Sequence, residues 1–191
     1  MEAPSPFVPR ASRRALGRLR YVLVALVATA LARPHTALAQ EGGIPLGAMA
    51  PGAAVVSLDG KAVDLAQFIG KTPVVLEFWA TWCPLCRQLE PAMAAARQQY
   101  AGRVTFVSVG VSSNQSAERQ KAYVDEKRLG GEFVFDRDGK AVAAYDVPHT
   151  SYVVVVDQAG KVVYTGVGGE QDIAAAVAKA VGSDGGMHRT R

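Results

Sequence analysis

Only two cysteines occur in this chain of 191 residues, and they stand three positions apart as Cys83 and Cys86. Two thiols at this spacing can form a disulfide and break it again, and such a pair exchanges two electrons with another dithiol. A disulfide between residues so close together closes a very short loop, so it would remove little entropy from the unfolded chain. The spacing therefore favours redox chemistry over a structural cross-link.

The residues around the pair predict a separate role for each thiol. An apolar run at 73–79 is followed by a short loop, and helical spacing of apolar residues begins at Cys83. A helix N-terminus favours negative charge, so Cys83 should ionise readily and act as the nucleophile. Cys86, one turn further on, is expected to be more shielded and to serve as the resolving thiol. Pro84 suits the first turn because no N–H is needed there.

Glu77 is the other candidate for catalysis, because it is the single carboxylate in the apolar run Pro73 to Trp79. A continuous apolar run is typical of a strand buried on both faces. If this strand is central, burial would raise the pKa of Glu77 and suit it to exchange protons with Cys86. The alternative is that Glu77 faces an edge of the sheet or has a satisfied partner.

A zinc site is disfavoured by the residues that the chain lacks. There is no second pair of cysteines, and the only histidine in the expected folded region is His149. Structural zinc requires four such ligands. No metal and no other cofactor is expected, because the cysteine pair itself holds the two electrons.

The elements that must position these residues follow from the pattern of the sequence, which alternates strands and helices. Strands are predicted at 54–58, 61–63, 73–79, 103–110, 133–136, 153–156 and 161–165, and helices at 64–69, 83–100, 115–129 and 171–181. Asp59-Gly60 supplies a hairpin turn, and Asp64 can cap the first helix. This order indicates an α/β domain over 54–181 that contains a mixed sheet.

The first 39 residues are predicted to be a signal peptide. Arginines precede the apolar run Tyr21 to Ala32, which is about 12 residues long and too short for a membrane-spanning helix. Ala37-Leu38-Ala39 fits a signal-peptidase site, so we expect cleavage before Gln40 and an exported protein. An uncleaved N-terminal membrane anchor is the alternative. Arg13-Arg14 loosely resembles a twin-arginine signal, so either general export route stays open.

The charge is concentrated in the same segment. Residues 1–39 hold six arginines against Glu2, which gives +5, and since the whole chain carries +4 the remainder carries −1. Nucleic acid is therefore not indicated as a partner. Residues 40–53 are rich in Gly, Pro and Ala and are predicted to be flexible, and residues 182–191 are predicted to be a disordered tail.

The run from Gly70 to Arg87, which contains Trp82-Cys83-Pro84-Leu85-Cys86, resembles the active-site segment of the TlpA/ResA-like branch of thioredoxin-fold proteins. The resemblance extends over nearly all of residues 47–181. It implies a three-layer thioredoxin fold with a central mixed sheet, an N-terminal β-hairpin and a central β-α insertion. It also implies that Glu77 is the buried acid of the fold and that Pro91 is the helix kink.

The resemblance implies an activity and partners as well. Members of this branch are exported thiol-disulfide oxidoreductases that usually keep partner thiols reduced, cytochrome c apoproteins among them. Protein thiols and disulfides are thus the expected substrates, a membrane protein the expected electron donor, and a monomer the expected state. The substrate groove would involve Trp82, Pro84, Thr150 and Ser151.

Two positions depart from the pattern of the family. Leu85 stands where relatives often have Pro or His, so the redox potential does not follow from the resemblance. Ser151 falls where the fold has a cis-proline facing the active site. Since a cis bond before a non-proline residue costs roughly 2.5 to 4 kcal/mol, Thr150-Ser151 is expected to be trans, with a changed loop path. Alternatively, a local shift would let Pro148 serve as the cis-proline.

Two other functions remain open from the sequence. Oxidase or isomerase activity would use the same residues in the other direction. A non-catalytic module could instead hold copper through Cys83, Cys86 and His149, although copper chaperones of this fold space their cysteines more widely.

Overall fold

The computed structural model describes residues 42–182. They form one mixed sheet of seven strands in the order β2-β1-β5-β4-β3-β6-β7. The strands are β1 (Ala54–Ser57), β2 (Ala62–Asp64), β3 (Val74–Trp79), β4 (Thr105–Val111), β5 (Glu132–Asp136), β6 (Tyr152–Val156) and β7 (Val162–Val167). The helices are α2 (Pro84–Gln99), α3 (Ala117–Lys127), α4 (Lys140–Ala144), α5 (Ile173–Gly182) and the short 3-10 helix η1 (Leu65–Phe68). The predicted signal peptide, and the predicted tail beyond Gly182, lie outside the described residues.

Strand β3 lies at the centre of the sheet, as its apolar run predicted. It pairs in parallel with β4 and antiparallel with β6, and all of its residues are buried. Because successive side chains of a strand point to opposite faces, Val75 and Glu77 share one face, and Leu76 and Phe78 share the other. The centre of the sheet thus holds one carboxylate among apolar neighbours.

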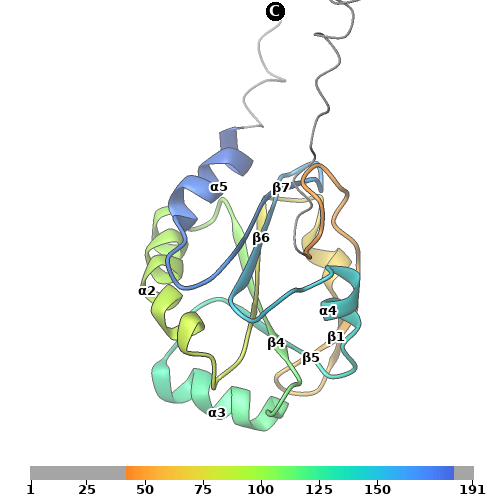
Figure 1. The fold of residues 1–191 in the computed structure, drawn as a ribbon, viewed down its shortest axis with the longest axis vertical. Helices are drawn as coiled ribbons and strands as arrows, with labels where there is room; N and C mark the ends of the chain where they lie inside the picture. Colours follow the sequence, from red (N-terminus) through yellow and green to blue (C-terminus); the bar gives the residue numbers. More distant parts are fainter. Residues whose placement is uncertain (1–41, 183–191) are drawn as a thin grey trace, which may run out of the picture. The chain divides into compact units, whose positions relative to one another are not determined.

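Helices cover both faces of this sheet, which gives the expected three-layer sandwich. Figure 1 shows α2 and α5 on one side and α4 on the other. The core divides accordingly. Val75 packs with Leu89, Met93 and Val177 on the α2/α5 face. On the opposite face, Leu76 and Phe78 belong to a second core cluster that includes Tyr145, which follows α4.

The N-terminal hairpin and the central insertion are both present. β1 and β2 pair antiparallel, and the Asp64 side chain accepts a hydrogen bond from the Ala66 backbone N–H at the start of η1. Between β4 and β6 the chain adds α3, β5 and α4. The sequence did not predict α4, a helix of five residues whose N-cap Gly139 makes no side-chain bond. The Asp136 carboxylate, at the end of β5, accepts the Val142 N–H in its place.

Residues 42–53 do not form the flexible segment that their composition predicted. Gly47 and Ala50 donate backbone hydrogen bonds to Val162 and Gly160, and Ile44 donates its N–H to the Tyr152 hydroxyl at 3.0 Å. The segment thereby lies along β7 and contributes buried Ile44 to the core. Gly and Pro content marks an irregular backbone here, and long-range hydrogen bonds hold that backbone in place.

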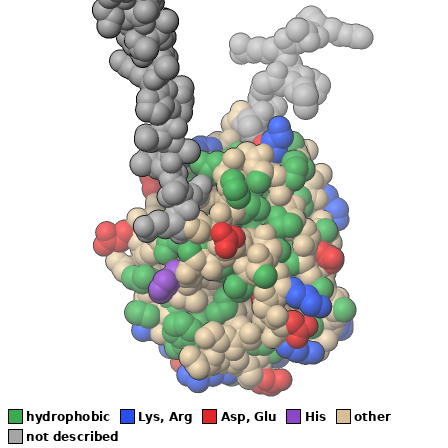
Figure 2. All heavy atoms as spheres, turned by 45° about the vertical axis from the view of Figure 1, so that its right-hand side comes forward, with side chains coloured by type: hydrophobic (Ala, Val, Ile, Leu, Met, Phe, Trp, Pro, Cys, Tyr) green, Lys and Arg blue, Asp and Glu red, His purple; other side chains and the backbone are tan. Residues whose placement is uncertain are grey.

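Charged side chains are scattered over the face seen in Figure 2, where single acidic and basic groups stand among hydrophobic and polar ones. Within residues 42–182, no helix is both long and apolar enough to cross a membrane.

Candidate active site

The two cysteines lie at the N-terminus of α2. Cys83 is the N-cap residue, and its sulfur accepts a hydrogen bond from the Cys86 backbone N–H at 3.1 Å. The two sulfurs are joined in a disulfide, with the Cα atoms 5.3 Å apart. Pro84 occupies the first turn, where the sequence placed it. An N–H directed at Cys83, together with the positive end of the helix dipole, favours a thiolate there once the disulfide is reduced.

The expected difference in shielding between the cysteines is not seen in this disulfide form. Cys83 is 1% exposed and Cys86 is 5% exposed, so Cys83 is the less accessible of the two. The assignment of Cys83 as the nucleophile therefore rests on its place at the helix terminus. Exchange requires direct attack at sulfur, and the disulfide form leaves Cys83 little exposed.

Glu77 lies in β3 on the face that packs against α2. It is 3% exposed, and its Oε2 lies 3.5 Å from the hydroxyl of Ser108, the neighbouring residue on β4. Burial in an apolar sheet raises the pKa of Glu77 to about 7. The group can therefore take up or give up a proton near neutral pH, as the sequence predicted for a buried acid.

A small cavity is lined by both Glu77 and Cys86. Its volume is about 30 Å³, and its lining includes Glu77, Cys86, Ser108 and Glu90. The aromatic side chains of Trp79, Tyr123 and Phe133 also line it, so part of the wall comes from the insertion between β4 and β6. A cavity of this size has room for about two water molecules. Glu77 and Cys86 thus border the same space beside the sheet.

The loop between β3 and Cys83 is held by the segment that follows β4. The Trp82 indole N–H donates to the Ser113 carbonyl at 2.8 Å, and the Thr81 backbone N–H donates to the Gln115 side-chain oxygen at 3.0 Å. The amide nitrogen of Gln115 in turn donates to the Val111 carbonyl at 2.6 Å. Trp82 remains 39% exposed beside the disulfide, so it is available to a partner protein.

The segment before β6 contains no cis bond, since every peptide bond among residues 42–182 is trans. The Ser151 N–H donates to the Phe78 carbonyl at 2.9 Å, a hydrogen bond that proline could not make. Ser151 has φ +65°, and its hydroxyl donates to the Gly168 carbonyl at 2.8 Å. The loop path thus differs from that of a cis-proline, and Pro148, beside Gly42, does not supply the cis bond either.

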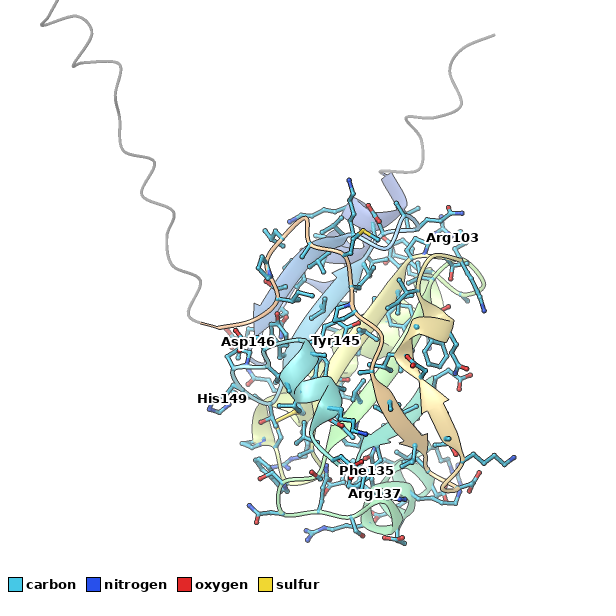
Figure 3. All side chains as sticks on the ribbon, turned by 90° about the vertical axis from the view of Figure 1, so that its right-hand side faces the viewer. Arg103, Phe135, Arg137, Tyr145, Asp146 and His149 are labelled. Carbon is cyan, nitrogen blue, oxygen red and sulfur yellow. A yellow bond between two sulfur atoms is a disulfide. The ribbon has the colours of Figure 1, made fainter. Side chains whose placement is uncertain are left out.

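His149 is exposed, and Figure 3 shows its side chain pointing outward at the edge of the domain. In the part of the chain that the structure describes, no three His, Cys, Asp or Glu residues are grouped so that they could hold a metal ion. The copper site of Cys83, Cys86 and His149 gains no support from this arrangement.

Sequence reasoning did not single out several residues that the structure brings to the site. They are Ser108, Gln115, Glu90 and Arg97. Two signals could have found some of them. Glu90 lies four residues after Cys86, so both share one face of the helix, and Ser108 is the polar residue in an otherwise apolar run of β4. Arg97 follows Glu90 by seven residues, about two turns of α2, so helical spacing could have paired them. The contacts of Gln115 are tertiary, and no local pattern predicts them.

The chain belongs to the Redoxin family, whose model matches residues 45–181. With its thioredoxin fold and its Cys-x-x-Cys pair at the start of a helix, it is a thiol-disulfide oxidoreductase.

Individual relatives agree with this class. The chain is 34% identical over 122 residues to the thioredoxin-like protein YneN of Bacillus subtilis, covering 63% of this chain and 71% of that protein. It is 28% identical over 152 residues to the thiol-disulfide oxidoreductase ResA of Bacillus subtilis, covering 79% and 83%. Among solved structures, a putative thiol:disulfide interchange protein DsbE from Chlorobium tepidum matches with a TM-score of 0.63 and 26% identity, covering 73% of this chain and 97% of that one.

Proposed function

We propose that this protein is an exported reductase of protein disulfides, with Cys83 as the nucleophile, Cys86 as the resolving thiol and Glu77 as the proton-transfer group. One observation carries the proposal: the cysteine pair lies at a helix N-terminus, and its second cysteine shares a cavity with a buried acid. The reducing direction and the extracytoplasmic location rest on the resemblance to TlpA/ResA-like proteins and on the signal-like N-terminal sequence. Cytochrome c apoproteins are the substrates that this resemblance suggests.

The reaction consists of two exchanges. The Cys83 thiolate attacks one sulfur of the partner's disulfide, which forms a Cys83–partner bond and releases the other partner sulfur as a thiolate that takes up a proton. Cys86 then gives its proton to Glu77 and attacks the Cys83 sulfur. This step forms the Cys83–Cys86 disulfide and releases the second partner thiolate. The partner gains two electrons, and a dithiol of a membrane protein would return two electrons to the cysteine pair.

The helix geometry accounts for the order of the two attacks. Cys83, at the N-cap, is the sulfur that the helix terminus stabilises as a thiolate, and it accepts the N–H of Cys86. Cys86 lies within the first turn, where it lines the cavity with Glu77. Each thiol is thus paired with a different means of activation: a dipole for Cys83 and a general base for Cys86.

The test of the direction is an equilibrium titration of the Cys83–Cys86 pair against glutathione and dithiothreitol. We expect a potential below about −220 mV, on the thioredoxin side of the scale. A potential near about −120 mV would show an oxidant instead. If no reversible disulfide forms, the catalytic function itself is wrong.

The test of export is the N-terminal sequence of the protein recovered from the cells that make it. A mature chain that starts at Gln40 supports a cleaved signal peptide. A chain that still starts at Met1 contradicts the cleavage.

A further inference from the structure

Glu77 is not the only charged residue near its cavity. Glu90, on α2, lines the same cavity, and its Oε1 accepts a hydrogen bond from Nη1 of Arg97 at 2.8 Å. Both side chains are mostly removed from solvent, with 28% of Glu90 and 12% of Arg97 exposed. This differs from the other ion pairs among residues 42–182, in which both side chains are about half exposed or more.

The position of Arg97 is fixed by its surroundings. Its Nε passes close to Gly131, where a Cβ would lie 3.4 Å from that nitrogen, so the guanidinium lies between α2 and the start of β5. Among the described residues its side chain hydrogen-bonds only to Glu90, and its Nε and Nη2 atoms are buried without a partner. The Arg97 charge is thus held beside Glu90, which itself lines the cavity of Glu77.

The charges act on Glu77 in opposite directions. Burial is the main cause that raises the pKa of Glu77, and the negative charge of Glu90 raises this pKa further. The positive charge of Arg97 lowers the pKa of Glu77, as does the hydrogen bond from Ser108. These are the signs expected for a like charge and an opposite charge near a buried acid.

Other polar residues also surround Glu77, besides Glu90 and Arg97. The remaining polar residues that line the cavity are Cys86 and Arg87 of α2, Ser108 of β4 and Tyr123 of α3, while β6 contributes Val153 opposite Glu77. Arg87 extends from the active-site end of α2, where it lies 3.5 Å from the Thr81 carbonyl.

We propose that the Glu90–Arg97 ion pair is a positioning element for the proton-transfer group. It holds two opposite charges at fixed places beside the cavity that Glu77 and Cys86 share, and so adjusts how readily Glu77 takes the proton of Cys86. The consequence for Cys86 rests on the proposed function, whereas the effect on Glu77 itself does not. Glu90 and Arg97 act through Glu77 and touch no substrate.

The experiment measures the protonation of Glu77 in two ways, by NMR and by its effect on the rate of attack by Cys86. Carboxyl-carbon NMR of the oxidised protein gives the pH at which Glu77 titrates. The reduced protein is then mixed with an aromatic disulfide whose released thiolate is coloured. The first release reports attack by Cys83, and the second reports attack by Cys86. The rate of the second release is measured against pH.

The two single variants should have opposite effects. One should lower both the NMR midpoint of Glu77 and the midpoint of the second release, and the other should raise both. Glu90→Gln removes the like charge, so Glu77 should titrate roughly half a pH unit or more below the wild-type value. Arg97→Met removes the opposite charge and should move the midpoint upward by a similar amount. Arg97→Lys keeps the charge and should stay near wild type, and the double variant Glu90→Gln/Arg97→Met should lie between the single variants.

The matched control is the exposed pair Glu126–Lys127 on α3, whose atoms are also 2.8 Å apart. Glu126→Gln and Lys127→Met should leave both midpoints unchanged. If Glu90→Gln and Arg97→Met leave the NMR midpoint of Glu77 in place, or move it in the same direction, the proposal is wrong. If the NMR midpoint moves as expected while the second release does not follow, the pair still sets the charge of Glu77, and it is the proton role in the proposed function that fails.

Discussion

The two faces of β3 are equally buried, yet they serve different purposes. On one face, Phe78 packs against Tyr145 and Tyr152, with ring centroids 5.3 and 6.0 Å apart, and Figure 3 shows Tyr145 beside α4. On the other face, Glu77 borders a cavity of about 30 Å³ next to Cys86. Phe78 and Glu77 are adjacent in the strand, yet Phe78 packs against two tyrosine rings and Glu77 borders a cavity with room for water.

This difference shows how the domain separates stability from chemistry. The packed face gains free energy from aromatic burial and contact. The reactive face lowers the stability of the folded protein above neutral pH, because the ionised carboxylate of Glu77 is kept away from solvent there. Variants of each face should therefore change different observables.

The largest effect is expected from the cysteines, which define the reactive face. Cys86→Ser should leave Cys83 able to attack but unable to be resolved, so a stable mixed disulfide with a substrate thiol accumulates. Cys83→Ser should abolish turnover and form no such adduct. Mass spectrometry after incubation with a disulfide substrate distinguishes the two. An adduct on Cys86 in Cys83→Ser, with none in Cys86→Ser, would reverse the assigned roles.

On the packed face, Phe78→Ala should lower the free energy of unfolding by about 3–5 kcal/mol, since it leaves a cavity between two tyrosine rings. Denaturant unfolding of the oxidised protein measures this loss. The titration midpoint of Glu77 should change little, because its side chain points to the opposite face. A loss below about 1 kcal/mol would contradict the packing described for this face.

For the reactive face, Glu77→Gln should stabilise the protein at high pH. The folded state holds the pKa of Glu77 at about 7, above the ordinary 4.5 of a glutamate, so the folded chain binds the proton more tightly. Stability is therefore full below the unfolded pKa and falls as pH rises from about 4.5 to about 7, by roughly 3 kcal/mol in total. Glu77→Gln should remove this pH dependence. If the free energy of unfolding depends on pH equally in both proteins, then ionisation of Glu77 does not destabilise the folded state.

A smaller effect is expected at Ser151, whose backbone N–H donates a hydrogen bond to the Phe78 carbonyl of β3. Ser151→Pro would remove that N–H and cannot adopt the positive φ of Ser151 without rearrangement. We expect a loss of about 1–3 kcal/mol in unfolding free energy. Ser151→Gly, which tolerates the backbone angle but loses the hydroxyl, serves as the comparison. Stabilisation by proline would show that this loop readily adopts a cis path.

The sequence predicted the parts of the fold that local pattern encodes. A continuous apolar run marked β3, Cys83 and Pro84 marked the start of α2, and Asp64 marked the cap of η1. The position of Glu77 beneath Cys86 followed from placing that strand at the centre.

Tertiary contacts decided what the sequence did not show. Residues 42–53 have the composition of a loop and are held by β7 and Tyr152. The start of α4 depends on Asp136, six residues before the N–H that it accepts. The low exposure of Cys83 depends on the chain that packs around it. None of these has a signature in neighbouring residues.

On the reactive face of β3, Glu77 is proposed to take the proton of Cys86, the resolving cysteine. The most direct measurement is the rate of the second thiolate release against pH, in wild-type protein and in Glu77→Gln. The wild-type rate should rise with pH, with a midpoint near the pKa of Glu77, about 7. In Glu77→Gln this rise should vanish and the rate near neutral pH should fall by roughly a hundredfold, while the first release stays unchanged. An identical second phase in both proteins would contradict the claim.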